Sequence, residues 1–255
     1  MSLVYHYTSI NTLALILKNG TIRLNCLKNV DDMNECLTDD YGNLANYLYA
    51  SSWTEDRLEN ISLWNMYTPH MAGIRIGLPP DMLDITLDEY DLITNGIVKG
   101  EDEEKEILIF GLTENVPHPI EYISSEDKKN LLDLSSKDEA TIKIDANNLG
   151  LKKDKQWEFQ KESRFVVLAV RMNKKYSKFD EARKAGLMLA LLNKEPISLN
   201  HIDLHVKKEA LDQMHVLLGP HCNESDRIIV ESLLKNFCPS NKNIVQKSAL
   251  KIRHR

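Results

Sequence analysis

The sequence lacks several patterns that mark common protein classes. It has four cysteines, Cys26, Cys36, Cys222 and Cys238, which are widely spaced and form no C-x-x-C pair. A disulfide framework or a zinc knuckle is therefore not expected, and a reducing cytoplasm is the natural location. No apolar run approaches the roughly 20 residues that cross a bilayer, and the N-terminus lacks the basic-then-apolar layout of a secretory signal. We expect a cytoplasmic protein with no membrane partner.

Two glycine-rich signatures are also missing. The glycines form neither G-x-G-x-x-G nor G-x-x-x-x-G-K-[ST], so nothing supports redox use of a nicotinamide cofactor or a phosphate-binding loop. Gly73 and Gly77 are too sparse to cradle phosphates. We expect them instead to let a strand approach another segment of the chain.

The composition is that of an ordinary globular protein, with an uneven distribution of charge. The chain has 255 residues, 42% of them hydrophobic and 27% charged, and a net charge of −6. This balance gives no general attraction to nucleic acid. Residues 101–106 are strongly acidic, whereas 241–255 contain lysine and arginine and no acid. A solvated basic end and a phosphate-contacting surface both remain open for this tail.

Apolar periodicity and capping residues predict a mixture of strands and helices. Strands are expected over 3–7, 21–24, 47–53, 72–78, 107–112, 163–170 and 215–218. Helices are expected over 9–20, from about residue 37, and over 56–66, 125–134, 180–193 and 223–237. Because strands and helices do not alternate regularly, we expect an α+β fold rather than a doubly wound sheet. A single domain over 1–255 is predicted, with a variable lobe or insertion around 83–150, where the pattern is weak.

Two aromatic or imidazole side chains lie on or beside predicted strands. His6 is mid-strand; as a neutral imidazole it can donate to a sugar hydroxyl or a carbonyl, or it is a satisfied core histidine. Thr8, two residues on, would contact the same ligand. Tyr67 can stack on a cationic ring through its electron-rich face. Alternatively, Tyr67 and Trp64, three residues apart, simply cover one side of a helix end.

A third segment places a carboxylate near a cation. If 157–164 is extended, Gln160, Glu162 and Arg164 share one face, and Arg164 favours an ionised Glu162. The pair fits either a catalytic carboxylate with its cation or a structural ion pair. Glu158 has the same strand parity, so the sequence leaves open which glutamate faces a cleft.

The best metal-like spacing is at 201–205. His201, Asp203 and His205 would share one face of a strand, and a fourth ligand would have to be His215 or His221. No H-E-x-x-H signature accompanies them. We therefore expect no metal site, and a metal hydrolase is the least favoured interpretation.

The order and spacing of these motifs resemble a bacterial family known as domain of unknown function 2971, over nearly the whole chain. The motifs are Y-x-Y-T-S at 5–9, D-x-x-E at 32–35, a serine-rich strand at 51–53, W-x-x-Y at 64–67, a G-x-x-I-G strand at 73–78, a W-x-x-E-x-E-x-R-like segment at 157–164, a G-P strand end at 216–220 and a terminal K-S at 247–248. Leu78 stands where the family has an aromatic residue.

That family is similar in layout to ADP-ribosyltransferase-like domains, including DarT-like nucleic-acid-modifying toxins and phage-defence effectors. The resemblance implies an α+β fold with an ADP-ribosyltransferase-like split β-sheet core and surrounding helices. It also implies that NAD is the substrate. The side chains implied to contact NAD are His6, Tyr7, Thr8, Ser52 and Tyr67.

The resemblance further implies a catalytic arrangement. Breaking the bond between nicotinamide and ribose passes through a state resembling an oxocarbenium ion, which needs a fixed negative charge nearby. Glu162 would supply that charge, while His6 orients NAD and Tyr67 stacks on nicotinamide. Gln160 and Arg164 would position the acceptor. Gln160 replaces the acidic residue usual there, so nucleic acid, protein and water all remain open as acceptors.

We therefore expect a mono-ADP-ribosyltransferase-like effector of the glycosyltransferase class, acting in a bacterial toxin or phage-defence system with an antitoxin or regulatory partner. The alternative is a catalytically inactive module that senses a nucleotide-like ligand or a phage component.

Overall fold

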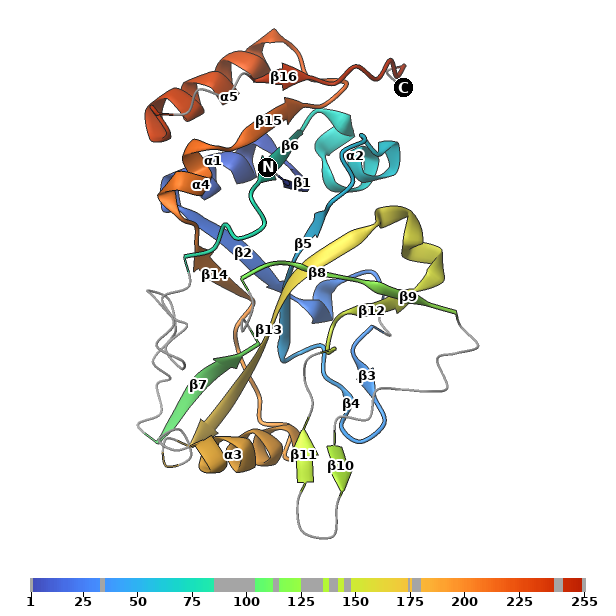
Figure 1. Ribbon diagram of the computed structural model, residues 1–255, viewed down its shortest axis with the longest axis vertical. Coiled ribbons are helices and arrows are strands. Elements are labelled where there is room, and N and C mark those ends of the chain that lie inside the picture. Colours follow the sequence, from blue (N-terminus) through green and yellow to red (C-terminus); the bar gives the residue numbers. More distant parts are fainter. Residues whose placement is uncertain are drawn as a thin grey trace.

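The computed structural model describes residues 2–32, 35–84, 104–111, 115–124, 135–137, 142–144, 148–173, 175, 180–240 and 245–253. These residues form a large mixed β-sheet with helices packed against it (Figure 1), which confirms the predicted α+β class. The helix predicted over 125–134 lies outside the described residues. So does much of 83–150, where the variable lobe is expected.

The main sheet has ten strands in the order β14-β2-β5-β1-β6-β15-β16, and β13 pairs with β5, β7 and β8. The strands are β1 (Val4–Thr8), β2 (Thr21–Cys26), β5 (Leu48–Thr54), β6 (Ile74–Leu78), β7 (Lys105–Phe110), β8 (His118–Pro119), β13 (Glu162–Asn173), β14 (His201–His205), β15 (His215–Leu218) and β16 (Gln246–Lys247). The long apolar run of β13 places it in the middle, paired along β5 on one side and β7 on the other.

The sheet is split along one edge of β5. β1 pairs with this edge through Tyr5 opposite Thr54, whereas β2 pairs further along it, through Asn25 opposite Ala50. The ladders leave residues 51–53 between them on this edge. Along its other edge, β5 pairs continuously with β13. β1 and β2 therefore separate from each other along this edge of β5, next to residues 51–53.

Short strand pairs lie beside the main sheet. They are β3 (Leu37–Thr38) with β4 (Gly42–Asn43), β9 (Glu121–Ile123) with β12 (Lys152–Asp154), and β10 (Ser135–Lys137) with β11 (Ile142–Ile144). The helix predicted from about residue 37 is wrong. The Thr38 hydroxyl donates to the Gly42 carbonyl and accepts the Tyr41 N–H, and Gly42 adopts φ 72°, which closes a tight hairpin instead.

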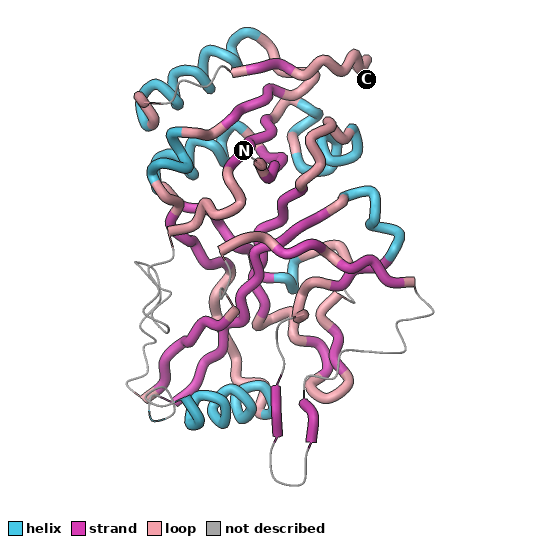
Figure 2. Tube along the Cα trace, viewed as in Figure 1, coloured by secondary structure: helices cyan, strands magenta, loops and turns pink. Residues whose placement is uncertain are grey.

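The helices lie toward the two ends of the molecule, with strands running between them (Figure 2). They are α1 (Ile10–Asn19), α2 (Ile61–Tyr67), α3 (Asp180–Leu192), α4 (Lys208–Asp212) and α5 (Glu224–Phe237), with 3-10 turns η1 (Leu27–Asn29), η2 (Pro69–Met71) and η4 (Lys155–Gln160). The Ser9 side chain caps α1 and Gly20, at φ 65°, ends it, as predicted. Asn223 and Asp226 form the predicted capping box of α5.

The helix predicted over 56–66 begins later than expected. The Asn60 side chain accepts the N–H groups of Ser62 and Leu63, so α2 starts at Ile61. The preceding residues form a local turn instead, in which the Thr54 hydroxyl accepts a hydrogen bond from the Asp56 N–H. These local bonds compete with a helical start.

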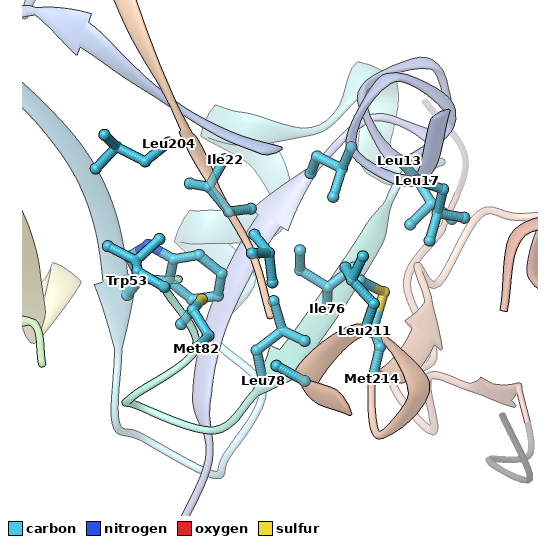
Figure 3. Close-up of a cluster of buried hydrophobic side chains, with 14 of the residues drawn as sticks. Leu13, Leu17, Ile22, Trp53, Ile76, Leu78, Met82, Leu204, Leu211 and Met214 are labelled. Carbon is cyan, nitrogen blue, oxygen red and sulfur yellow. The ribbon is translucent and has the colours of Figure 1, made fainter. Parts of the chain in front are cut away.

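The main core packs α1 and α4 against β-strands (Figure 3). Leu13 and Leu17 of α1 face Ile76 of β6, with Met214 after α4 in the same cluster. A fully buried aliphatic side chain of this kind contributes about 1.5–3 kcal/mol. A second cluster joins β5 and β13 to α3. Together the two clusters fix the central strands whose edges carry the polar residues considered below.

Gly73 lies where α2 and β1 come closest to β6. A Cβ at this position would lie 2.4 Å from the Thr8 carbonyl oxygen and 2.6 Å from the Thr68 Cβ. The prediction that this glycine permits a close approach is confirmed. Gly77 is less confined, because its nearest neighbour is the Tyr5 ring at 3.0 Å.

Replacing Gly73 with alanine is therefore expected to lower the free energy of unfolding by about 1–3 kcal/mol, because the new methyl group overlaps a backbone carbonyl. Urea denaturation measures this change. Gly77→Ala is the matched control and should cost less, since an aromatic ring can shift. Equal losses in the two variants would contradict the close approach at Gly73.

Candidate functional site

A cavity of about 580 Å³ lies at the split in the sheet. Its walls come from β1, α1, β2, η1, β5, α2, β12, η4, β13 and β14. This volume is within the usual range of small-molecule sites. All the side chains predicted from the sequence as site residues line it, namely His6, Tyr7, Thr8, Ser52, Tyr67, Gln160, Glu162 and Arg164. Four segments remote in the sequence thus converge on one place.

The cavity receives side chains from both faces of the sheet. Tyr5 and Glu162 both lie opposite Thr54, so by strand parity they share one face. His6, the next residue along β1, belongs to the other face, with Trp53. The two sets can line one cavity because β1 leaves β5 at this point.

His6 is held in a defined tautomer. Its Nδ1 lies 2.7 Å from the Ser52 carbonyl oxygen. A carbonyl only accepts, so Nδ1 carries the proton and Nε2 has the lone pair. Burial lowers the pKa of His6 below its ordinary value, although this hydrogen bond opposes the shift. The ring also packs on Trp53, with centroids 5.1 Å apart. His6 therefore presents a neutral imidazole whose Nε2 can accept a hydrogen bond from a hydroxyl group.

Glu162, which begins β13, is an ionised carboxylate and only 6% exposed. Its Oε1 accepts from Arg164 Nε at 2.5 Å and its Oε2 from Lys153 Nζ at 2.9 Å. Burial alone would raise the pKa of this carboxyl, but the charges of Arg164 and Lys153, with hydrogen bonds from Arg164 and Ser52, lower it to about 2. Glu162 is an anion at neutral pH.

Arg164 joins two carboxylates in the interior. It is 1% exposed; its Nη1 lies 2.8 Å from Glu35 Oε2 and also donates to the Gly150 carbonyl at 2.9 Å. Burial would lower its pKa, but Glu162 and Glu35 raise it. Burial raises the pKa of Glu35, while Arg164 opposes this. The arginine thereby ties β13 to the segment at Glu35 and to the turn at Gly150.

Lys153 belongs to the site although the sequence did not single it out. Its Nζ donates to Gln160 Oε1 at 2.8 Å as well as to Glu162, and lies 5.4 Å from the Trp157 ring centroid. In the sequence, 152–155 looks like a solvated charged segment. Only the pairing of β12 with β9 brings this side chain inside. No local signal in the sequence marks it.

Gln160 reaches the site by a different route from the one predicted. It lies at the end of η4, and Lys161, at φ 45°, turns the chain into β13. The prediction that it shares a strand face with Glu162 is wrong. Its amide is nevertheless buried in the site, where Nε2 donates to the Tyr67 hydroxyl at 2.8 Å. Glu158 is exposed on η4, so Glu162 is the glutamate that lines the cavity.

The aromatic residues divide into a packed pair and an accessible ring. Trp64 is fully buried and meets Tyr7 edge-on, with centroids 4.8 Å apart. The Tyr7 hydroxyl accepts the Asn60 N–H, which positions the start of α2. Tyr67, at the other end of α2, lines the cavity with a ring that is 44% exposed. Ser52 is exposed as well.

The segment at 201–205 is a strand, β14, as the metal-like spacing requires. Asp203, however, is held by Arg23 through bonds of 2.8 Å and 3.0 Å. Within the described part of the chain, no group of three or more histidine, cysteine, aspartate or glutamate residues is arranged to hold a metal ion.

Comparisons with known proteins found no matching family model, no matching curated protein and no matching solved structure. Over the described ranges, no helix is long and apolar enough to span a membrane.

The buried charges predict how stability responds to substitution. Arg164→Met is expected to lower the free energy of unfolding by about 3–5 kcal/mol, because it leaves two carboxylates buried without their shared cation. Urea denaturation at neutral pH measures the loss. Arg23→Met, which breaks an exposed pair with Asp203, should cost at most about 1 kcal/mol. Similar losses for the two variants would contradict the buried arrangement.

The same residues predict how the free energy of unfolding changes at acid pH. The folded-state pKa of Glu162 is about 2, below its ordinary value of 4.5, so its contribution is complete above 4.5 and is lost as pH falls toward 2. Glu35, with its raised pKa, acts in the opposite direction. Because the folded-state pKa of Glu35 lies above its ordinary value of 4.5, its destabilising effect is removed as pH falls from neutral toward 4.5. We therefore expect Glu35→Gln to lack this gain, so that its stability rises less or falls more than that of the parent between pH 7 and 4.5, measured by urea denaturation across that window. A pH dependence above 4.5 that matches the parent would contradict this assignment.

Proposed function

We propose that this chain is an NAD-dependent mono-ADP-ribosyltransferase-like enzyme, an effector of a bacterial toxin or phage-defence system. The observation that carries the proposal is the convergence of His6, Tyr67 and Glu162 on one cavity. The split sheet is what an ADP-ribosyltransferase-like core requires, and it supports the same proposal. An imidazole, an accessible phenol ring and an ionised carboxylate are the groups that NAD cleavage needs.

Each group has a distinct task in binding. The cationic nicotinamide ring stacks on the exposed face of Tyr67. His6 accepts a hydrogen bond from a ribose hydroxyl through Nε2, because its Nδ1 proton is donated to the Ser52 carbonyl. Ser52 and Glu162 contact each other, so a ribose hydroxyl entering beside Ser52 reaches the carboxylate. Tyr7 and Thr8 complete the wall on β1.

The reaction then moves positive charge from the nicotinamide ring to the ribose. The bond between the ribose C1 and the pyridine nitrogen breaks, its electron pair neutralises the nicotinamide, and positive charge develops on the ribose. Glu162, ionised at neutral pH, stabilises that charge. An acceptor oxygen or nitrogen bonds to C1 and releases its proton to solvent. Gln160 helps to hold the acceptor, and Arg164 contributes by fixing Glu162.

One observation favours a second function. Both oxygens of Glu162 already accept hydrogen bonds from cations, Arg164 and Lys153. This weakens the electrostatic stabilisation that Glu162 can give to a developing sugar cation. A catalytically inactive module that senses a nucleotide or a phage component would use the same cavity without breaking a bond. An antitoxin or regulatory partner fits either function.

Nicotinamide release from NAD by the purified protein tests the enzyme. Glu162→Gln is expected to reduce the rate at least about 100-fold, the usual loss when a group that stabilises transition-state charge is removed. Glu158→Gln is the matched control, because Glu158 is exposed on η4, and should leave the rate unchanged. Tyr67→Ala removes the ring and the hydroxyl that accepts from Gln160, keeps every residue of the buried ion pairs, and should also reduce release.

Labelled NAD added to cell extract, followed by separation of nucleic acid from protein, identifies the acceptor. Label in one fraction names it, and nicotinamide release without label in either fraction means that water is the acceptor. Absence of both label and nicotinamide release, with NAD still raising the melting temperature, would exclude the enzyme and support the binding module.

A further inference from the structure

A second cavity lies between the end of α3 and the segment that forms and follows the β3–β4 hairpin. Its volume is about 300 Å³, at the lower end of the range for small-molecule sites. The described residues that line it are all different from those that line the first cavity. Figure 1 shows β4 and α3 toward the end of the molecule opposite α5. A ligand in this second cavity therefore binds apart from His6, Tyr67 and Glu162.

Part of the lining is apolar and fixed in place. Tyr41, Leu44 and Leu191 are buried and belong to the cluster that joins β5 and β13 to α3. The Leu44 N–H donates to the Cys36 carbonyl at 2.9 Å, which closes the hairpin segment. The Lys194 N–H donates to the Leu191 carbonyl at 3.2 Å, which closes the turn after α3. The walls are thus formed before any ligand enters, as is usual for small-molecule sites.

Tyr47 brings an unsatisfied hydroxyl group to this cavity. Its side chain lines the cavity and is only 6% exposed. In the part of the chain that the structure describes, no residue forms a hydrogen bond with this hydroxyl. Burial and the charge of Glu195 raise the pKa of Tyr47, so the hydroxyl keeps its proton at neutral pH. A buried donor of this kind requires an acceptor, which a molecule inside the cavity can supply.

Lys194 supplies positive charge to the same cavity. It is exposed, and it is the only charged residue among the described ones that line this cavity. Its ammonium forms no ion pair with a carboxylate of the described residues. The neighbouring Glu195, by contrast, is paired with Lys105 at 2.8 Å. The ammonium of Lys194 is therefore available to an anionic ligand, and the paired Glu195 opposes such a ligand only weakly.

These groups together select a class of ligand. The ammonium and the phenol both donate, and the amide of Asn46, which also lines the cavity, can donate as well. Such donors match a carboxylate. The carbonyls that end α3 place partial negative charge close to Lys194, which favours one negative charge on the ligand over two. The rings of Tyr41 and Tyr47 favour a ligand with an aromatic ring of its own.

We propose that the second cavity binds a small aryl carboxylate. The carboxylate lies between the Lys194 ammonium and the Tyr47 hydroxyl, and the ring packs against Tyr41 and Leu44. The bound molecule joins the hairpin segment to the end of α3. This inference is independent of the proposed function, because binding here requires neither NAD nor any residue of the first cavity.

Isothermal titration calorimetry of the purified protein with phenylacetate tests the site. Binding is expected with a Kd of about 1 mM or lower, the usual strength for a ligand of this size. Phenylacetamide has the same ring without the charge, and phenyl phosphate carries a second charge. Each should bind at least about tenfold more weakly than phenylacetate, because charge-assisted hydrogen bonds are lost or the second charge is repelled.

Two substitutions test the residues that hold the carboxylate. Lys194→Met removes the charge and Tyr47→Phe removes only the hydroxyl, and each should weaken phenylacetate binding about tenfold. Tyr47→Phe should keep the melting temperature of the unliganded parent, because no described residue loses a hydrogen bond. Arg23→Met is the matched control, since it removes a cation that lines the first cavity, and it should bind phenylacetate as the parent does.

Several outcomes overturn the proposal. Neither heat nor a rise in melting temperature at about 10 mM phenylacetate means that the cavity does not bind this class of ligand. Equal affinity for phenylacetamide or phenyl phosphate contradicts a carboxylate site. A lower melting temperature of unliganded Tyr47→Phe gives the hydroxyl a structural role instead. Weaker binding in Arg23→Met, with unchanged binding in Lys194→Met, moves the probe to the first cavity. Absence of nicotinamide release with phenylacetate binding intact removes only the proposed enzyme.

Discussion

The buried guanidinium of Arg164 is the charge on which both the site and the centre of the sheet depend. A cation enclosed in a protein interior is costly unless its donors are met by acceptors. Here they are met by Glu162 on its own strand, by Glu35 and by the Gly150 carbonyl. Segments remote in the sequence must therefore arrive together. The same bonds hold Glu162 ionised, so the structural ion pair and the carboxylate proposed for catalysis are one arrangement.

The split in the sheet has a similar double consequence. Where β1 leaves β5, the Ser52 carbonyl has no partner on β1 in the ladder, and a backbone acceptor left unsatisfied is costly. The His6 Nδ1 proton satisfies it. Opening the sheet thus creates the cavity and at the same time selects the tautomer of the histidine that lines it. Tyr7, on the opposite face, secures the start of α2 and with it the helix that carries Tyr67.

Features that depend on residues close together in the sequence were predictable. Ser9 and Gly20 bracket α1 because capping acts within one turn, and the apolar run after Arg164 can only be a central strand. The residues expected in the site do line one cavity. Features that depend on distant pairing were missed. Gln160 lies on a 3-10 turn rather than on β13, and Lys153 enters the site only because β12 pairs with β9. Periodicity cannot reveal contacts of that kind.

Lys153 bears directly on the proposed chemistry, because its ammonium is bound to Glu162. Arg164 is locked by acceptors on several sides, whereas a lysine ammonium on a flexible stem can exchange partners. Lys153 holds Oε2 and Arg164 donates to both oxygens, so the charge of Glu162 is largely neutralised in the structure. The Gln160 oxygen and the Trp157 ring contact the same ammonium and would retain it if Nζ withdrew from Oε2. The proposed enzyme requires such a withdrawal to expose charge to a sugar cation, whereas the proposed binding module does not.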